Sequence, residues 1–152
     1  MNVRVVVGQL GKVITLLGVI LLLIGTWGLA VPFEEGLVEE RAEQALLASG
    51  GFAILLGSIT WLLALGFSDL RRTILRGDPH GMPPGQRMGR REALVLVSAA
   101  WIVGAAVTGL PYLLWAYMGD GAPTDHPFRS PVDCYFEAMN GLSTTGATVL
   151  LN

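Results

Sequence analysis

The chain has 152 residues, of which 52% are hydrophobic and 14% are charged, and its formal net charge is −2. Soluble domains carry about a quarter charged residues, so this composition excludes an ordinary globular enzyme, and its hydrophobicity excludes a disordered chain. The charge balance gives no electrostatic reason to expect nucleic acid as a partner. A single cysteine, Cys134, can form neither an internal disulfide nor a thiolate metal site, and we interpret it as a packing residue.

Three long segments, residues 13–31, 45–67 and 93–118, contain no Asp, Glu, Lys or Arg. About 20 apolar residues of helix cross a hydrocarbon core about 30 Å thick, so each segment predicts a transmembrane helix. The apolar core of a cleaved signal peptide has about 7–15 residues, whereas the first segment has 19, so we expect it to be retained. The sequence therefore predicts an all-α, multi-pass protein of the cell (plasma) membrane, embedded in the lipid bilayer, with no enzymatic activity and no cofactor.

The basic residues lie mainly on one side of these segments. Eight of the ten precede residue 13 or lie between residues 68 and 92, whereas the connection at residues 32–44 holds five Glu and one Arg. Cytoplasmic loops are enriched in Lys and Arg, so we expect a cytoplasmic N-terminus, a transmembrane helix pair over residues 1–68 and a basic cytoplasmic linker over residues 69–92. The inverted orientation would translocate six arginines. A Pro/Gly cluster at residues 77–85 is predicted to interrupt helical structure in this linker.

Small residues are frequent in the predicted helices. Helices in lipid associate where small residues let their backbones approach, so these positions are candidate packing surfaces. Glycine is also common in membrane helices in general, and the sequence leaves both explanations open. Pro111 lacks a backbone donor and is predicted to kink the third helix near its outer end. The small residues are Gly18, Gly25 and Gly28 in the first helix, Gly50, Gly51 and Gly57 in the second, and Ala105 and Gly109 in the third.

A short helix is predicted at residues 131–140. Ser130 suits the N-cap, Pro131 the first helical position, and Asp133 completes a Ser-x-x-Asp capping box. Gly141 suits the position just past the C-terminal end. About ten residues of helix extend about 15 Å, which is too short to cross a bilayer, so we expect this helix to be re-entrant.

Residues 143–148, which follow this helix, are rich in hydroxyl side chains and contain Gly146. Irregular backbone at membrane depth is tolerated only where it is buried in protein or lines a watery cavity. Such a segment can present carbonyl oxygens to a dehydrated cation, which the C-terminal end of the helix dipole also favours. An ordinary polar turn is the alternative, but the order of elements favours an ion filter.

Several motifs follow one another between residues 89 and 151: Arg90-Arg91-Glu92-Ala93, Trp101, Gly109-Leu110-Pro111, Phe136-Glu137-Ala138, Asn140-Gly141 and Ser143-Thr144-Thr145-Gly146-Ala147-Thr148. Together they resemble the Trk/Ktr/HKT superfamily of potassium uptake proteins, and most closely its TrkH-type membrane subunit. Residues 1–88 resemble the family only in their organisation, in which an extra pair of helices precedes the first pore repeat.

The resemblance implies a potassium-channel-like fold in which four helix–pore-loop–helix repeats surround one pore. Residues 93–118 would be the outer helix of the first repeat, residues 131–140 its pore helix and residues 143–148 its part of the filter, near the outer face. Thr144, Thr145, Gly146 and Ala147 match the filter positions, and the carbonyls of Thr144 and Thr145 are the expected potassium ligands. Gly146 fits a potassium preference, since relatives with serine there resemble sodium-favouring transporters. Ser143 and Asn140 depart slightly from the usual pattern.

The resemblance also implies a homodimer of the complete subunit and a cytoplasmic nucleotide-binding regulatory partner. One loop supplies one side of a carbonyl ring, so residues 93–152 are interpreted as an incomplete first repeat, the remaining repeats belonging to the full-length subunit. We expect this fragment alone not to conduct.

Two other functions compete with potassium transport. One is a small three-helix membrane scaffolding or binding module in which residues 143–148 are an inert external tail. The other is an intramembrane hydrolase, which is weak because Ser143 misses the G-x-S-x-G spacing by one residue. In addition, His80 and His126 are predicted on opposite sides of the bilayer.

Overall fold

A computed structural model describes residues 3–30, 40–76, 89–118 and 122–150. It contains four α-helices: α1 (Val3–Ala30), α2 (Glu40–Arg76), α3 (Arg90–Tyr117) and α4 (Pro131–Ser143), with a 3₁₀ helix, η1 (Pro127–Arg129), before α4. The described parts of the chain hold no strand. Three helical segments are long and apolar enough to cross a membrane: Val3–Ala30, Ala42–Leu65 and Arg90–Tyr117. The prediction of an all-α protein with three such helices is confirmed.

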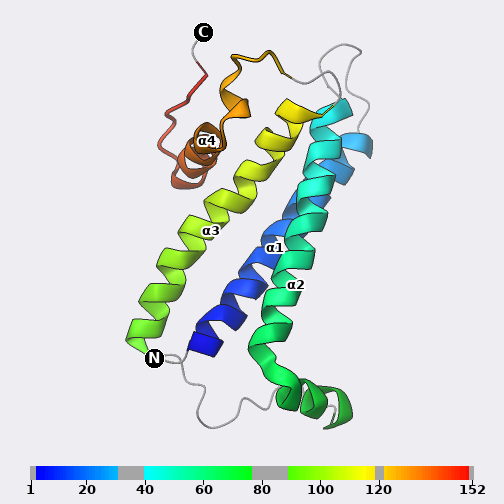
Figure 1. The fold of residues 1–152 in the computed structure, drawn as a ribbon, viewed down its shortest axis with the longest axis vertical. Coiled ribbons are helices and arrows are strands. Elements are labelled where there is room, and N and C mark those ends of the chain that lie inside the picture. Colours follow the sequence, from blue (N-terminus) through cyan, green and yellow to red (C-terminus); the bar gives the residue numbers. More distant parts are fainter. Residues whose placement is uncertain (1–2, 31–39, 77–88, 119–121, 151–152) are drawn as a thin grey trace.

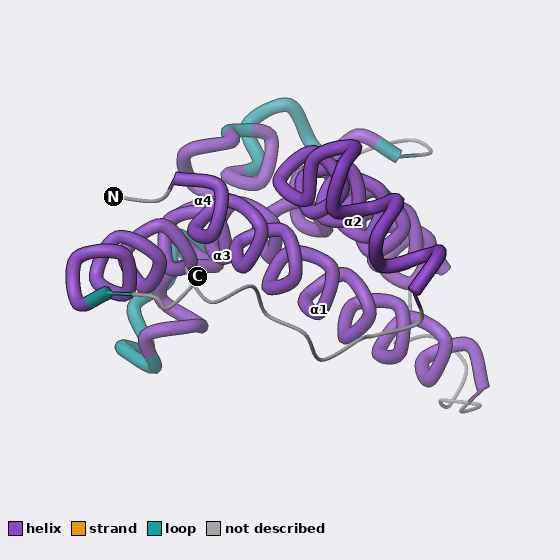
Figure 2. The backbone as a smooth tube through the Cα atoms, turned by 90° about the horizontal axis from the view of Figure 1, so that it is seen from below, coloured by secondary structure: helices purple, strands orange, loops and turns teal. Residues whose placement is uncertain are grey.

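The three long helices lie side by side and alternate in direction (Figure 1). Viewed along the bundle, α1 packs extensively on α2, and α3 contacts both of them (Figure 2). The short helix α4 packs against α3 and η1, beside the C-terminal half of α3 (Figure 1). The buried side chains of Ile14, Leu21, Ala53 and Val107 join the three long helices in one apolar core.

Glycines form the contact between α1 and α2. A Cβ atom added at Gly18 would lie 2.8 Å from the carbonyl oxygen of Gly50, and one added at Gly57 would lie 2.7 Å from that of Gly11. The two pairs are seven residues apart on each helix, as an antiparallel register requires. The buried residues of α1 between Gly11 and Gly25 are likewise spaced alternately three and four apart, the pattern of a coiled-coil seam. These glycines therefore form a helix-packing surface, and the general frequency of glycine in membrane helices is not needed to explain them.

Two other glycines, Gly51 and Gly109, do not belong to the α1–α2 contact. Gly51, next to Gly50, has no atom within 4 Å of an added Cβ, so it lies outside the α1–α2 contact. On α3, a Cβ at Gly109 would lie 3.1 Å from the carbonyl oxygen of Cys134. This glycine therefore lets α4, and not another long helix, pack closely on α3. Gly109, one of the two small residues predicted on α3, thus serves the contact with the short helix.

Helix α3 runs through the buried Pro111 to Tyr117, next to the predicted end at residue 118, and its kink stays a prediction. Two other helix ends differ from those predicted. Helix α1 begins at Val3, ten residues before the charge-free segment. The helix α2 continues past the predicted boundary at residue 68 to Arg76. The Glu-rich connection at residues 32–39 and the Pro/Gly cluster at residues 77–85 lie outside the described residues. Polar residues at the end of a membrane helix are tolerated because long side chains can reach the headgroups, so charge-free runs underestimate helix length.

Candidate functional site

The start of α4 follows the predicted cap. The Ser130 hydroxyl accepts a hydrogen bond from the Asp133 N–H at 3.4 Å, and Pro131 is the first helical residue. The Ser130 N–H itself donates to the carbonyl oxygen of Pro127 at 2.9 Å. The N-cap is therefore confirmed, but the capping box is not, because the Ser130 N–H that the Asp133 side chain would accept closes the turn of η1 instead.

Aromatic packing holds η1 and α4 against the end of α3. The ring of Phe128 lies 4.9 Å from that of Tyr112 and 6.2 Å from that of Trp115, centroid to centroid. The Arg129 guanidinium donates to the carbonyl oxygen of Ala122 from Nε at 2.9 Å and from Nη2 at 2.7 Å. It also lies over the Tyr117 ring, 5.1 Å from the centroid. These contacts set the direction in which α4 leaves α3.

Cys134 belongs to this packing. Its side chain is 2% exposed, and its thiol donates to the Phe128 carbonyl oxygen at 3.2 Å. Desolvation by burial, and then the negative charge of Asp133, raise the pKa of the Cys134 thiol. The thiolate is the reactive form, so a buried thiol of raised pKa is inert. The interpretation of Cys134 as a packing residue is confirmed.

We therefore expect Cys134 to resist a membrane-impermeant maleimide in the folded protein and to be labelled fully in denaturant. Cys134→Ala should lower stability by about 1 kcal/mol, because it removes one sulfur atom and its hydrogen bond from a packed site. Mass spectrometry after labelling and thermal unfolding measure the two effects. Rapid labelling of the folded protein would contradict the buried position.

The C-terminal end of α4 differs from the prediction. The helix does not stop before Gly141 but continues to Ser143, and Thr144 takes the left-handed conformation with φ 55° and ψ 27°. The N–H of Thr144 donates to the carbonyl oxygen of Gly141 at 3.3 Å, and that of Thr145 to Asn140 at 3.2 Å. Gly141 was wrongly assigned as the terminating residue, because a glycine can also occupy an ordinary helical position. Thirteen residues of helix extend about 20 Å, which is still too short to cross a bilayer.

Beyond Thr144 the chain turns back and runs alongside α4 (Figure 1). The Glu137 carboxylate fastens this returning segment. Its Oε1 accepts a hydrogen bond from the Thr148 hydroxyl, and its Oε2 accepts one from the Val149 N–H, both at 3.0 Å. The Thr148 hydroxyl in turn accepts from the Leu150 N–H at 3.1 Å. Glu137 is part of the Phe136-Glu137-Ala138 motif, but its contact with the returning segment was not predicted, because no local pattern couples it to residues eleven and twelve positions later.

A second group of polar side chains braces the loop at the end of α4. The Thr145 hydroxyl donates to Asn140 Oδ1 at 2.9 Å and lies 3.3 Å from the Ser143 hydroxyl. The Asn140 Nδ2 is buried and has no hydrogen-bond partner in the described part of the chain. The two residues that depart from the family pattern, Asn140 and Ser143, therefore both contact the proposed filter residue Thr145.

The four predicted filter residues, Thr144 to Ala147, lie together on this loop. All four are exposed, and Gly146 has a φ of 73° with nothing within 4 Å of an added Cβ. No hydrogen bond from the described residues reaches any of their four carbonyl oxygens. These oxygens are thus available to a ligand, while the side chains of Asn140 and Glu137 hold the loop on either side.

We expect Glu137→Gln to loosen the returning segment, because an amide offers one acceptor oxygen where the carboxylate offers two. Loss of one hydrogen bond to a charged group should speed hydrogen exchange at residues 145–150 roughly tenfold. Exchange of that peptide, measured by mass spectrometry, tests this. Asp125→Asn, which removes an exposed carboxylate before η1, is the control; equal acceleration in both variants would exclude a specific role for Glu137.

No family model, no curated relative and no solved structure matches this chain. The structure therefore supports, on its own, an α-helical protein with three helices that could span a membrane. To these it adds a short helix followed by a braced loop whose carbonyl oxygens accept no hydrogen bond from the described part of the chain.

Proposed function

We propose that this chain is the N-terminal part of a Trk-type potassium uptake subunit and that residues 144–147 contribute its first pore loop. Carbonyl oxygens of this loop, with Thr144 and Thr145 foremost, would replace part of the water around a potassium ion. The observation that carries the proposal is a set of four consecutive carbonyl oxygens that accept no hydrogen bond from the described residues, on a loop that follows a helix too short to cross a bilayer.

The chemistry of the loop suits a large monovalent cation. Residues 141–150 contain no acidic side chain, so the ligands on offer are neutral oxygens. Neutral carbonyl oxygens in a ring match the hydration shell that potassium gives up, and the partial negative charge at the end of α4 adds to the attraction. Both carboxylate oxygens of Glu137, the nearest acid in the sequence before the loop, accept hydrogen bonds from Thr148 and Val149.

A ring of carbonyls needs more than one loop. The other ligands would come from further pore loops of the complete subunit, and the homodimer and the cytoplasmic nucleotide-binding partner belong to the same proposal through the family resemblance. The exposure of residues 143–148 supports one competing function, a three-helix scaffolding module whose tail faces solvent. In a complete pore, the other loops would cover this surface instead.

Uptake in cells that lack their own potassium transporters distinguishes the two functions. The locus is expressed together with any reading frame that follows codon 152, and growth at low potassium and rubidium uptake are measured. We expect both to be restored. A protein that reaches the membrane but restores neither, or a reading frame that stops after residue 152, would favour the scaffolding module.

A further inference from the structure

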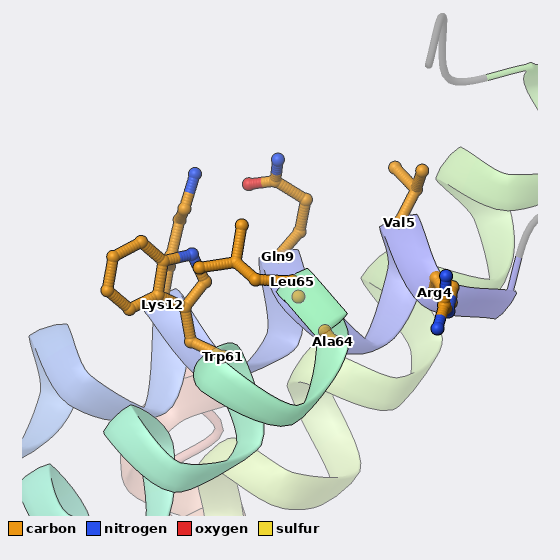
Figure 3. Close-up of a pocket in the computed structure, with 8 residues that line it drawn as sticks. Arg4, Val5, Gln9, Lys12, Trp61, Ala64 and Leu65 are labelled. Atoms are coloured by element: carbon orange, nitrogen blue, oxygen red, sulfur yellow. The ribbon is translucent and has the colours of Figure 1, made fainter. Parts of the chain in front are cut away.

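A groove of about 90 Å³ lies between α1 and α2 at the end of the bundle that carries the N-terminus (Figure 3). Gly8 and Ala64, both of which line it, approach each other closely, since a Cβ at Gly8 would lie 3.2 Å from that of Ala64. Nearby, the close approach of Gly11 to the Trp61 backbone holds the two helices together. The lining residues are Arg4, Val5, Gly8, Gln9 and Lys12 of α1 and Trp61, Ala64 and Leu65 of α2.

The groove is positively charged and contains no acid. Arg4 and Lys12 lie two helical turns apart, both are exposed, and neither forms an ion pair with any described residue. Figure 3 shows Lys12 and Gln9 extending from α1 on the side where Trp61 and Leu65 extend from α2. The cations of Arg4 and Lys12, the Gln9 amide and the Trp61 indole N–H thus line the groove, and all four can donate hydrogen bonds to an anion.

Apolar surface adjoins these donors. Lys12 immediately precedes the charge-free segment of residues 13–31, and Trp61 lies six residues before the end of the charge-free segment on α2. The groove therefore lies at the boundary between headgroups and hydrocarbon, where tryptophan is also enriched. A lipid phosphate would meet the cations there, and its acyl chains would extend along the exposed apolar sides of the two helices.

From this juxtaposition we infer that the groove binds the phosphate of an anionic phospholipid in the leaflet that faces the N-terminus. A free phosphate would satisfy the charges but would leave the adjoining apolar surface unused, so a lipid is the better match. The inference does not depend on potassium transport.

Native mass spectrometry tests it on the protein released from vesicles of equal phosphatidylglycerol and phosphatidylcholine. We expect phosphatidylglycerol to be retained preferentially and Lys12→Gln to lower that preference roughly fivefold, as expected for one basic residue near an anionic headgroup. Lys12→Gln combined with Arg4→Gln should abolish it. Arg91→Gln removes an exposed cation at the same end of the bundle but outside the groove, and should leave the preference unchanged (Figure 1).

Three outcomes would overturn the inference. Equal losses in Lys12→Gln and Arg91→Gln would show a general surface potential instead of a site, and no preference in the unaltered protein would show no site at all. Displacement of the lipid by excess inorganic phosphate would assign the groove to a free anion. The charge-conserving pair Arg4→Lys and Lys12→Arg should retain the preference, which separates loss of charge from misfolding.

Discussion

Gly18→Leu is expected to separate α1 from α2 and to destabilise the bundle strongly. An added Cβ would already lie 2.8 Å from the Gly50 carbonyl oxygen and 2.8 Å from the Ile54 nitrogen. Both are backbone atoms, which cannot rotate aside as a side chain would, so the helices must move apart. Overpacking costs about 1–3 kcal/mol, and we expect a value at the upper end, or a midpoint of thermal unfolding lower by roughly 10 °C.

Gly51→Leu is the matched control for this prediction. Gly51 follows Gly50, the residue on α2 that Gly18 contacts, but it has nothing within 4 Å of an added Cβ. A leucine there should leave the unfolding midpoint nearly unchanged. Thermal unfolding of the full chain in detergent, followed by tryptophan fluorescence, measures both variants. Equal destabilisation would show that the glycines serve helix flexibility rather than close contact.

Under the proposed function, Gly146→Ser is expected to erode the discrimination between potassium and sodium by the complete subunit while leaving membrane insertion intact. Gly146 has a φ of 73°, a left-handed conformation that costs a residue with a side chain about 1–2 kcal/mol. Relief of that strain would rotate the neighbouring peptide groups and move the carbonyl oxygens out of register. A change of this size corresponds to a roughly tenfold loss of selectivity.

The control for Gly146→Ser is Gly141→Ser. Gly141 lies within α4, has no positive φ, and likewise has nothing within 4 Å of an added Cβ. Competition of sodium with rubidium uptake, measured for both variants, gives the selectivity. Unchanged selectivity in Gly146→Ser would remove this glycine from the filter, and an equal change in Gly141→Ser would attribute the effect to α4 instead.

Much of the fold followed from the sequence because its signals are local. Charged side chains are excluded from hydrocarbon, so runs without them predict spanning helices whatever their neighbours are. The cap at Ser130 is equally local, since a hydroxyl and a backbone N–H three residues later determine it. The end of α4 was mispredicted because Gly141 is compatible both with a helix end and with a helix interior.

The amino-acid sequence alone determined that this protein has three apolar helices, a capped short helix and a polar loop after it. Only the tertiary structure decided which glycines are contacts, since a Cβ at Gly50 would meet the Gly18 carbonyl oxygen on α1, whereas one at Gly51 would meet nothing within 4 Å. It also decided that Glu137 and Asn140 hold the loop, through partners that no local pattern links to them. Apolar helix runs and helix caps depend on a residue and its immediate neighbours, whereas close approach and bracing depend on where another segment of the chain comes to lie.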